Sequence, residues 1–115
     1  MTLPWDGLIA VVKRDCPTCV LAAPVLGELA RQRGLQVYTQ DDPSFPETVP
    51  EPIDDTALDI SHRLKIEIVP TLIRLQNGRE VARKMGAAEW DGPEMVTVIR
   101  HQIEAPPTAE RGGRP

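Results

Sequence analysis

The chain has 115 residues, of which 41% are hydrophobic and 26% are charged, and a formal net charge of -4 at pH 7. This size and composition are typical of one globular domain that buries a core without cross-links. The negative charge and the lack of a clustered Lys/Arg run argue against a nucleic-acid partner, because phosphate binding needs a basic stripe. No segment is apolar for long enough to cross a membrane, and residues 1–7 lack the basic start of a signal peptide, so we expect a cytoplasmic protein.

The first part of the chain predicts a strand, a helix and a second strand. Residues 8–12 are a short apolar run rich in β-branched side chains, which indicates a buried central strand. Over residues 16–33 apolar side chains recur at spacings of three and four, as in a helix, and Pro17 suits its first turn. Residues 35–39 alternate as a strand does. Such a unit is right-handed and its two strands are parallel.

An acidic, proline-rich segment, residues 41–55, separates this unit from the rest of the chain. Its prolines and carboxylates predict a loop, with no helix or strand before Ile53. Such a segment is most often a tolerated insertion, and less often it rims a site and selects a partner. A helix capped by Asp55 or Thr56 and ending at Leu64 is expected next.

The second part of the chain predicts a hairpin and a last helix. Residues 66–75 and 80–85 indicate two strands, and the Asn77-Gly78 pair between them is a strong hairpin signal. Residues 93–103 have helical periodicity. The predicted order is β-α-β-α-β-β-α, an α/β fold with one four-stranded mixed sheet and helices on both faces. We expect one domain over residues 1–103 and a disordered tail or linker over residues 104–115, which have no apolar face to bury.

The chemistry is predicted at Cys16-Pro17-Thr18-Cys19, which follows a strand and opens a helix. A helix N-terminus has unpaired N–H groups and about half a positive charge, which stabilises an anion there. The thiolate is the nucleophile in disulfide exchange, so Cys16 is the cysteine expected to ionise and attack. The spacing brings the second sulfur within bonding reach, so Cys19 is expected to resolve the mixed disulfide. Pro17 and Thr18 are then expected beside the bound substrate.

A second candidate element is Val69-Pro70, at the start of a predicted strand. A proline there cannot continue the ladder of the sheet, and the bond before it is a candidate for the cis form. We expect that Val69 would then present its backbone to an extended substrate beside the sulfurs.

Other interpretations of these residues remain open. The two cysteines could be half of a zinc site, but only His62 and His101 could complete it and their spacing fits no zinc-finger pattern, so we expect no metal. The cysteines could also be inert buried side chains. Lys13 and Arg14 could lower the pKa of Cys16 against the opposing charge of Asp15, or all three could be solvated loop charges.

Several motifs together resemble the thioredoxin family in order and rough spacing over about residues 8–103: Cys16-Pro17-Thr18-Cys19, Pro24, Ile68-Val69-Pro70-Thr71-Leu72, Asn77-Gly78 and Met85-Gly86-Ala87. The resemblance implies a thioredoxin-like fold with Cys16 as nucleophile and Cys19 as resolving thiol. It also implies that Pro70 is a cis-proline and that Gly86 packs closely beside the substrate groove.

The chain departs from the family pattern in several ways, among them the acidic, proline-rich insertion between Thr39 and Thr56 and the Pro17-Thr18 dipeptide between the cysteines. Asp15 stands where thioredoxin has a tryptophan, and Ala10 stands where it has a buried acid that is thought to take the proton of the resolving thiol. Only fifteen residues precede Cys16 in this sequence, so we expect it to lack the first strand and helix of the family and to form a shorter, glutaredoxin-like core. These departures leave the redox potential and the direction of electron flow open.

The resemblance implies a monomeric oxidoreductase that reduces or exchanges protein disulfides, with no cofactor beyond the redox-active Cys16–Cys19 disulfide. Its electron donor would be a reductase or glutathione. Two alternatives remain. The missing tryptophan and acid would suit a thioredoxin-like docking module of a larger protein, and the short core would suit a glutathione-linked, glutaredoxin-like enzyme.

Overall fold

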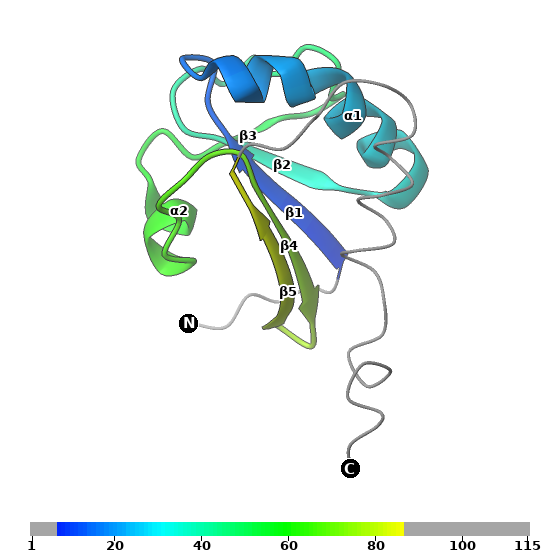
Figure 1. Cartoon of the computed structure of the whole chain (residues 1–115), viewed down its shortest axis with the longest axis vertical. Coiled ribbons are helices and arrows are strands. Elements are labelled where there is room, and N and C mark those ends of the chain that lie inside the picture. The colour runs from blue at the N-terminus through cyan, green and yellow to red at the C-terminus, as the bar shows by residue number, and fades with distance from the viewer. Residues whose placement is uncertain (1–6, 87–115) are drawn as a thin grey trace.

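The computed structural model describes residues 7–86, and the statements below refer to that part of the chain. The predicted last helix, the tail, both proposed domain ends and His101 lie outside the described residues. The described elements are, in chain order, β1 (Gly7–Val12), α1 (Pro17–Arg33), β2 (Gln36–Thr39), β3 (Ile53–Asp54), α2 (Asp59–Arg63), β4 (Thr71–Gln76) and β5 (Arg79–Met85) (Figure 1).

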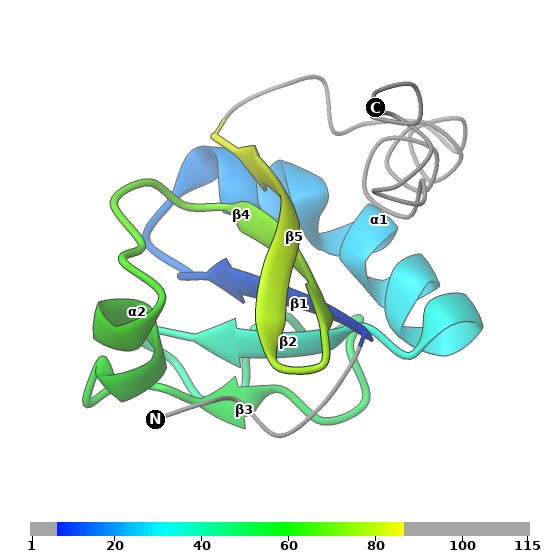
Figure 2. The same ribbon diagram turned by 90° about the horizontal axis from the view of Figure 1, so that it is seen from below.

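The strands form one mixed sheet in the order β3-β2-β1-β4-β5 (Figure 2). β1 runs parallel to β2 and antiparallel to β4, and β4 pairs antiparallel with β5 across the Asn77-Gly78 turn. The mixed α/β sheet is therefore confirmed. The prediction of four strands was wrong, because Ile53 and Asp54 pair in parallel with Tyr38 and Thr39 and add a fifth strand within the described residues. A strand of two residues is too short to produce a periodic pattern.

The two faces of the sheet carry separate apolar clusters. Leu8, Ala10 and Val12 of β1 pack with α1, and the intervening Ile9 and Val11 face the other way. This is the alternation expected of a strand that is buried on both sides. On the second face the side chains packed against the cluster come mainly from α2 and the turn after it, namely Ile60, Leu64 and Ile66. Helices on both faces of the sheet are thus confirmed.

α2 is shorter than predicted. It begins at Asp59 and not after Asp55 or Thr56, and its N-cap residue is Leu58, which has a φ of 65° and makes no capping bond with its side chain. Asp55 nevertheless accepts hydrogen bonds from the amides of Ile60 and Ser61 at 2.9 Å each. The carboxylate that the sequence suggests as a cap therefore does accept N–H groups of the first turn of α2, although Asp55 lies several residues before the helix and is not its N-cap residue.

Residues 41–52, here called the acidic strap, form turns without a helix or strand, as predicted. The strap is nevertheless not a loose insertion. Phe45 and Val49 are only 2% and 5% exposed and belong to the core cluster under α1. Thr48 donates a hydrogen bond of 2.6 Å from its hydroxyl to the Ala23 carbonyl. The strap therefore packs along α1 and contributes to the core.

The described residues contain no helix that is both long and apolar enough to cross a membrane.

Candidate functional site

Cys16 is the N-cap residue of α1. Its backbone is extended, with φ -155° and ψ 108°, and Pro17 occupies the start of the helix, where a missing N–H costs nothing. The Cys16 sulfur accepts a hydrogen bond of 3.2 Å from the Cys19 amide, one of the N–H groups that a helix leaves unpaired at this end. The sulfur therefore lies at the positive end of the helix, as the sequence predicts, and it is partly exposed.

Cys19, one turn further on, is fully buried in the apolar cluster between α1 and the sheet. Burial raises the pKa of the Cys19 thiol, and so does its hydrogen bond with the Cys16 side chain. A backbone hydrogen bond from Lys13 acts in the opposite direction on this pKa, and the negative charge of Asp41 raises it further. The two thiols are thus unequal: one is reachable from solvent and the other is held in its protonated form.

Val69 and Pro70 lie beside the first cysteine although they follow it by more than fifty residues. The Cys16 thiol donates a hydrogen bond to the Val69 carbonyl oxygen across 3.7 Å. The Val69–Pro70 peptide bond is cis, and so is the Phe45–Pro46 bond of the strap. The structure thereby brings Val69 and Pro70 to the end of β1, where the chain leaves the sheet for α1.

Gly86, the residue after β5, lies beside Pro70. Its amide donates a hydrogen bond of 2.8 Å to the Pro70 carbonyl. It has a φ of +78°, which favours glycine, while a Cβ at this position would make only an ordinary contact of 3.4 Å with Cγ2 of Ile68. Of the other predicted site residues, Pro17 is exposed and Thr18 is half-buried on the first turn of α1. The described residues hold no group of three or more His, Cys, Asp or Glu side chains suited to a metal ion.

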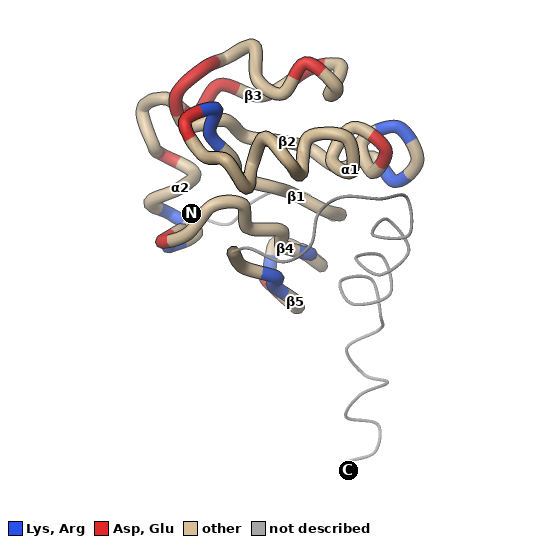
Figure 3. The backbone as a smooth tube through the Cα atoms, turned by 45° about the horizontal axis from the view of Figure 1, so that its top comes forward, with Lys and Arg blue, Asp and Glu red and all other residues tan. Residues whose placement is uncertain are grey.

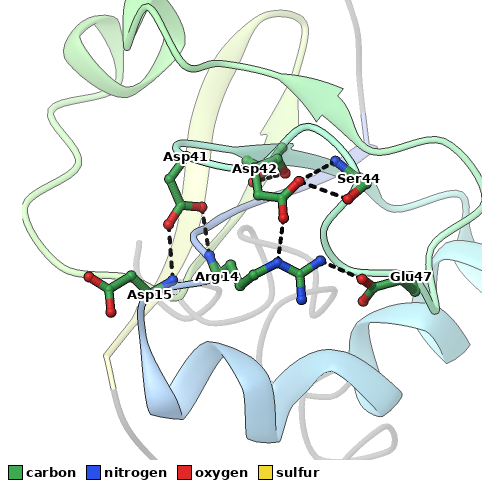
Figure 4. Close-up of polar contacts among 7 residues, drawn as sticks. Arg14, Asp15, Asp41, Asp42, Ser44 and Glu47 are labelled. Carbon is green, nitrogen blue, oxygen red and sulfur yellow. Dashed lines mark hydrogen bonds and ion pairs between the residues drawn. The ribbon is translucent and has the colours of Figure 1, made fainter.

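The sequence interpretation missed a set of contacts just before the cysteines. The carboxylate of Asp41 accepts hydrogen bonds from the amides of Arg14, at 2.7 Å, and Asp15, at 2.9 Å (Figure 4). The Arg14 guanidinium pairs with both Asp42 and Glu47. Arg14 is therefore an exposed charge, as one of the two interpretations expects, but its side chain is paired with the acidic strap.

An aromatic ring and a serine complete this network. The Arg14 guanidinium lies over the Phe45 ring, 4.9 Å from its centre. Hydrogen bonds from the Ser44 backbone and hydroxyl, together with Arg14, lower the pKa of Asp42 to about 2. Arg14 also lowers the pKa of Glu47. The only sequence signal for these contacts is a run of acids that could neutralise one arginine, and it does not say which acid pairs with which group.

The fold and the placement of the cysteines define a class of protein. A β-α-β unit followed by a β-hairpin, with a Cys-x-x-Cys pair at the start of the first helix opposite an X-Pro bond, is a thioredoxin-like arrangement. No protein-family model and no curated protein matches the sequence. The likeness is therefore one of structure.

Two solved structures illustrate this likeness. Thioredoxin-2 of a malaria parasite, described as a component of the parasite's protein secretion machinery, superposes with a TM-score of 0.53 and 14% identity, covering 87% of this chain and 97% of the other. The thioredoxin of Malassezia sympodialis, an allergen named Mala s 13, gives a TM-score of 0.52 and 18% identity, covering 86% of this chain and 77% of the other. The protein described here thus has the thioredoxin fold.

Proposed function

We propose that this protein is a thiol–disulfide oxidoreductase that reduces or exchanges protein disulfides through Cys16 and Cys19. The observation that carries the proposal is the inequality of the two sulfurs. Cys16 is partly exposed at the N-terminus of α1 and contacts the Val69 carbonyl, while Cys19 is buried one turn behind it. Attack needs a sulfur that substrate can reach, and resolution needs a second sulfur that stays protonated until the mixed disulfide forms.

The proposed reaction moves two electrons from the cysteine pair to the substrate. Cys16 releases its proton to solvent, and its thiolate attacks one sulfur of the substrate disulfide. The substrate S–S bond breaks, its other sulfur leaves as a thiolate that takes up a proton, and a mixed disulfide with Cys16 remains. Cys19 then loses its proton and attacks the Cys16 sulfur, which releases the second substrate thiol and leaves the Cys16–Cys19 disulfide. An external dithiol reductase or glutathione would restore the reduced pair.

Backbone and small side chains around the cysteines would hold the substrate. An extended peptide could pair with the backbone of Val69, as peptides pair with exposed strand edges. Pro17 and Thr18 flank the sulfur on one side, and Gly86 lies next to Pro70 on the other. Exposed apolar side chains near these positions in the chain, Val20, Ile68 and Met85, would contact the substrate around its disulfide. We propose that the protein acts as a cytoplasmic monomer that needs no metal and no cofactor other than its own disulfide.

The proposal is tested by the redox equilibrium of the cysteine pair. The protein is equilibrated in a series of dithiothreitol or glutathione buffers, and its free thiols are alkylated and counted by mass. A single two-electron transition that is absent from Cys16→Ser and from Cys19→Ser is expected. If no intramolecular disulfide forms at any potential, the enzyme proposal fails.

One observation favours a second candidate, a thioredoxin-like docking module. Ala10 is fully buried in the same apolar cluster as Cys19, so the position at which the resemblance implies an acid carries no proton acceptor. A docking module would bind a protein partner equally well after both cysteines are changed to serine, and it would show no turnover of insulin disulfides. A glutathione-linked enzyme would instead keep its activity in Cys19→Ser.

A further inference from the structure

The loop between β1 and α1 is held mainly by the strap. The loop comprises Lys13, Arg14 and Asp15, and it leads directly into Cys16. Its last two amides are both bound by one carboxylate, that of Asp41, which is 27 residues away from Arg14 in the chain. Hydrogen bonds to a carboxylate are about twice as strong as those between neutral groups, so these two are strong contacts of the loop backbone.

Asp41 is itself fixed in place. The Gln40 amide, just before it, donates a hydrogen bond of 2.9 Å to the Val12 carbonyl at the end of β1. On its other side, Asp42 accepts the Arg14 guanidinium, and the Asp42 carbonyl accepts the Thr39 hydroxyl at 2.9 Å. Asp41 therefore links the end of β2 to the loop that carries the nucleophile (Figure 4), and the residues on both sides of it are held by hydrogen bonds of their own.

We propose that Asp41 is a positioning residue for Cys16: by binding the amides of Arg14 and Asp15 together, it fixes the direction from which the Cys16 sulfur meets a disulfide held against Val69. This inference rests on the proposed oxidoreductase function. Asp41 touches neither sulfur through these bonds, so it acts through the backbone. Small displacements of a reacting group are costly, since a misplacement of about 1 Å can slow a reaction by about a hundredfold.

Two effects of Asp41 must be told apart by experiment: the placement of Cys16 through the backbone, and the effect of its negative charge on the thiols. Asp41 also raises the pKa of Cys19 by its charge, so a loss of activity alone would not identify its role. Attack on a docked protein disulfide needs the correct direction of the sulfur, whereas alkylation by the small neutral reagent iodoacetamide does not. The alkylation rate is measured on its high-pH plateau, where a further rise in pH no longer increases it, so that a change in a thiol pKa does not alter the fraction of reactive thiolate.

The experiment compares Asp41→Ala, Asp41→Asn and the matched control Asp54→Asn in the full chain. Asp54 is an acid on β3 that also accepts a local amide, that of Thr56 at 2.8 Å, so this control removes the same charge elsewhere while, like Asp41→Asn, it keeps one acceptor oxygen. For Asp41→Ala we expect kcat/KM for insulin disulfides to fall about tenfold, while the plateau rate of alkylation changes less than about twofold. Asp41→Asn keeps one acceptor oxygen and is expected to recover part of the loss, and Asp54→Asn should match the wild type.

Hydrogen exchange supplies an independent measurement. The amides of Arg14 and Asp15 should exchange faster in both Asp41 variants than in the wild type, even where the variants remain folded by circular dichroism. Equal losses in insulin reduction and alkylation would overturn the positioning role, and so would unchanged insulin reduction. A wild-type protein without insulin reductase activity would overturn the proposed function itself, which is a different result from an active wild type whose variants do not differ from it.

Discussion

Gly27 offers a direct test of the packing between the acidic strap and α1. Gly27 lies inside α1, where alanine in place of glycine would ordinarily stabilise a helix by about 1 kcal/mol. In this structure a Cβ at Gly27 would lie 2.7 Å from the carbonyl oxygen of Thr48 and 2.8 Å from its Cβ. Neither contact can be relieved by turning a flexible side chain, because one atom is backbone and the other is attached to it. Gly27→Ala must therefore push the strap away from the helix.

The size of the effect follows from three contributions. Overpacking of a filled interface costs about 1–3 kcal/mol. Moving Thr48 also weakens the hydrogen bond from its hydroxyl to the Ala23 carbonyl, which is worth about 1 kcal/mol. In the opposite direction, the higher helix propensity of alanine stabilises the folded protein by about 1 kcal/mol. We expect Gly27→Ala to lower the free energy of unfolding by about 2 kcal/mol.

Urea denaturation followed by circular dichroism measures this change. Thr48→Ala is the matched control, because it removes the hydrogen bond without adding an atom, and it should cost about 1 kcal/mol. Chemical shifts in Gly27→Ala should change over residues 45–49 and not in the hairpin of β4 and β5. An increase in the urea midpoint for Gly27→Ala, which helix propensity alone would give, would refute the reasoning.

Two further predictions concern carboxylates. Ser44→Ala removes one of the bonds that hold the pKa of Asp42 at about 2, so an NMR titration should find that pKa closer to the ordinary aspartate value of 3.8. Because the folded-state pKa is the lower one, the contribution of Asp42 to stability is present above pH 4 and is lost as the pH falls toward 2, and Ser44→Ala should weaken this acid dependence. Asp55→Ala removes a buried acceptor of the Ile60 and Ser61 amides and the Ser61 hydroxyl, and it should cost about 2–4 kcal/mol in urea denaturation.

The sheet and α1 could be predicted because their signals are local. A short β-branched run identifies β1, apolar side chains at spacings of three and four identify α1, and the Asn77-Gly78 pair identifies the hairpin. The place of Cys16 at a helix N-terminus follows from the same local pattern. These elements agree with the structure within a few residues at each end, apart from β4, which begins only after Pro70.

The strap and α2 could not be predicted in the same way, because contacts between distant residues decide their form. Phe45 and Val49 are isolated apolar residues in a segment of acids and prolines, so no period shows that they are buried. The binding of Asp41 to the amides before Cys16 depends on how β2 and β1 end side by side. Figure 3 shows the acidic residues gathered on the strap and the loops around it, yet the pairing of those charges exists only in the folded chain.

The burial of Ala10 leads to a last prediction about the site. Ala10 is fully buried among apolar side chains on the α1 face of β1, in the same cluster as Cys19. A carboxyl group there would have no prepared partner, so Ala10→Asp should raise the pKa of the new group and destabilise the fold by at least about 3 kcal/mol at neutral pH.

The pH dependence of Ala10→Asp identifies the cause. At low pH the carboxyl group is neutral in both the folded and the unfolded state. As the pH rises from about 4, the group ionises in the unfolded state but stays neutral in the folded state, so the loss of stability should grow until the pH reaches the raised folded-state pKa. Ala10→Asn is the matched control, since it adds nearly the same volume without a charge and its loss should not depend on pH over this range. Equal pH profiles for the two variants in urea denaturation would show that volume, and not charge, is what this position excludes. A thioredoxin-like enzyme that keeps an alanine here has to release the Cys19 proton without help from a buried acid at this position.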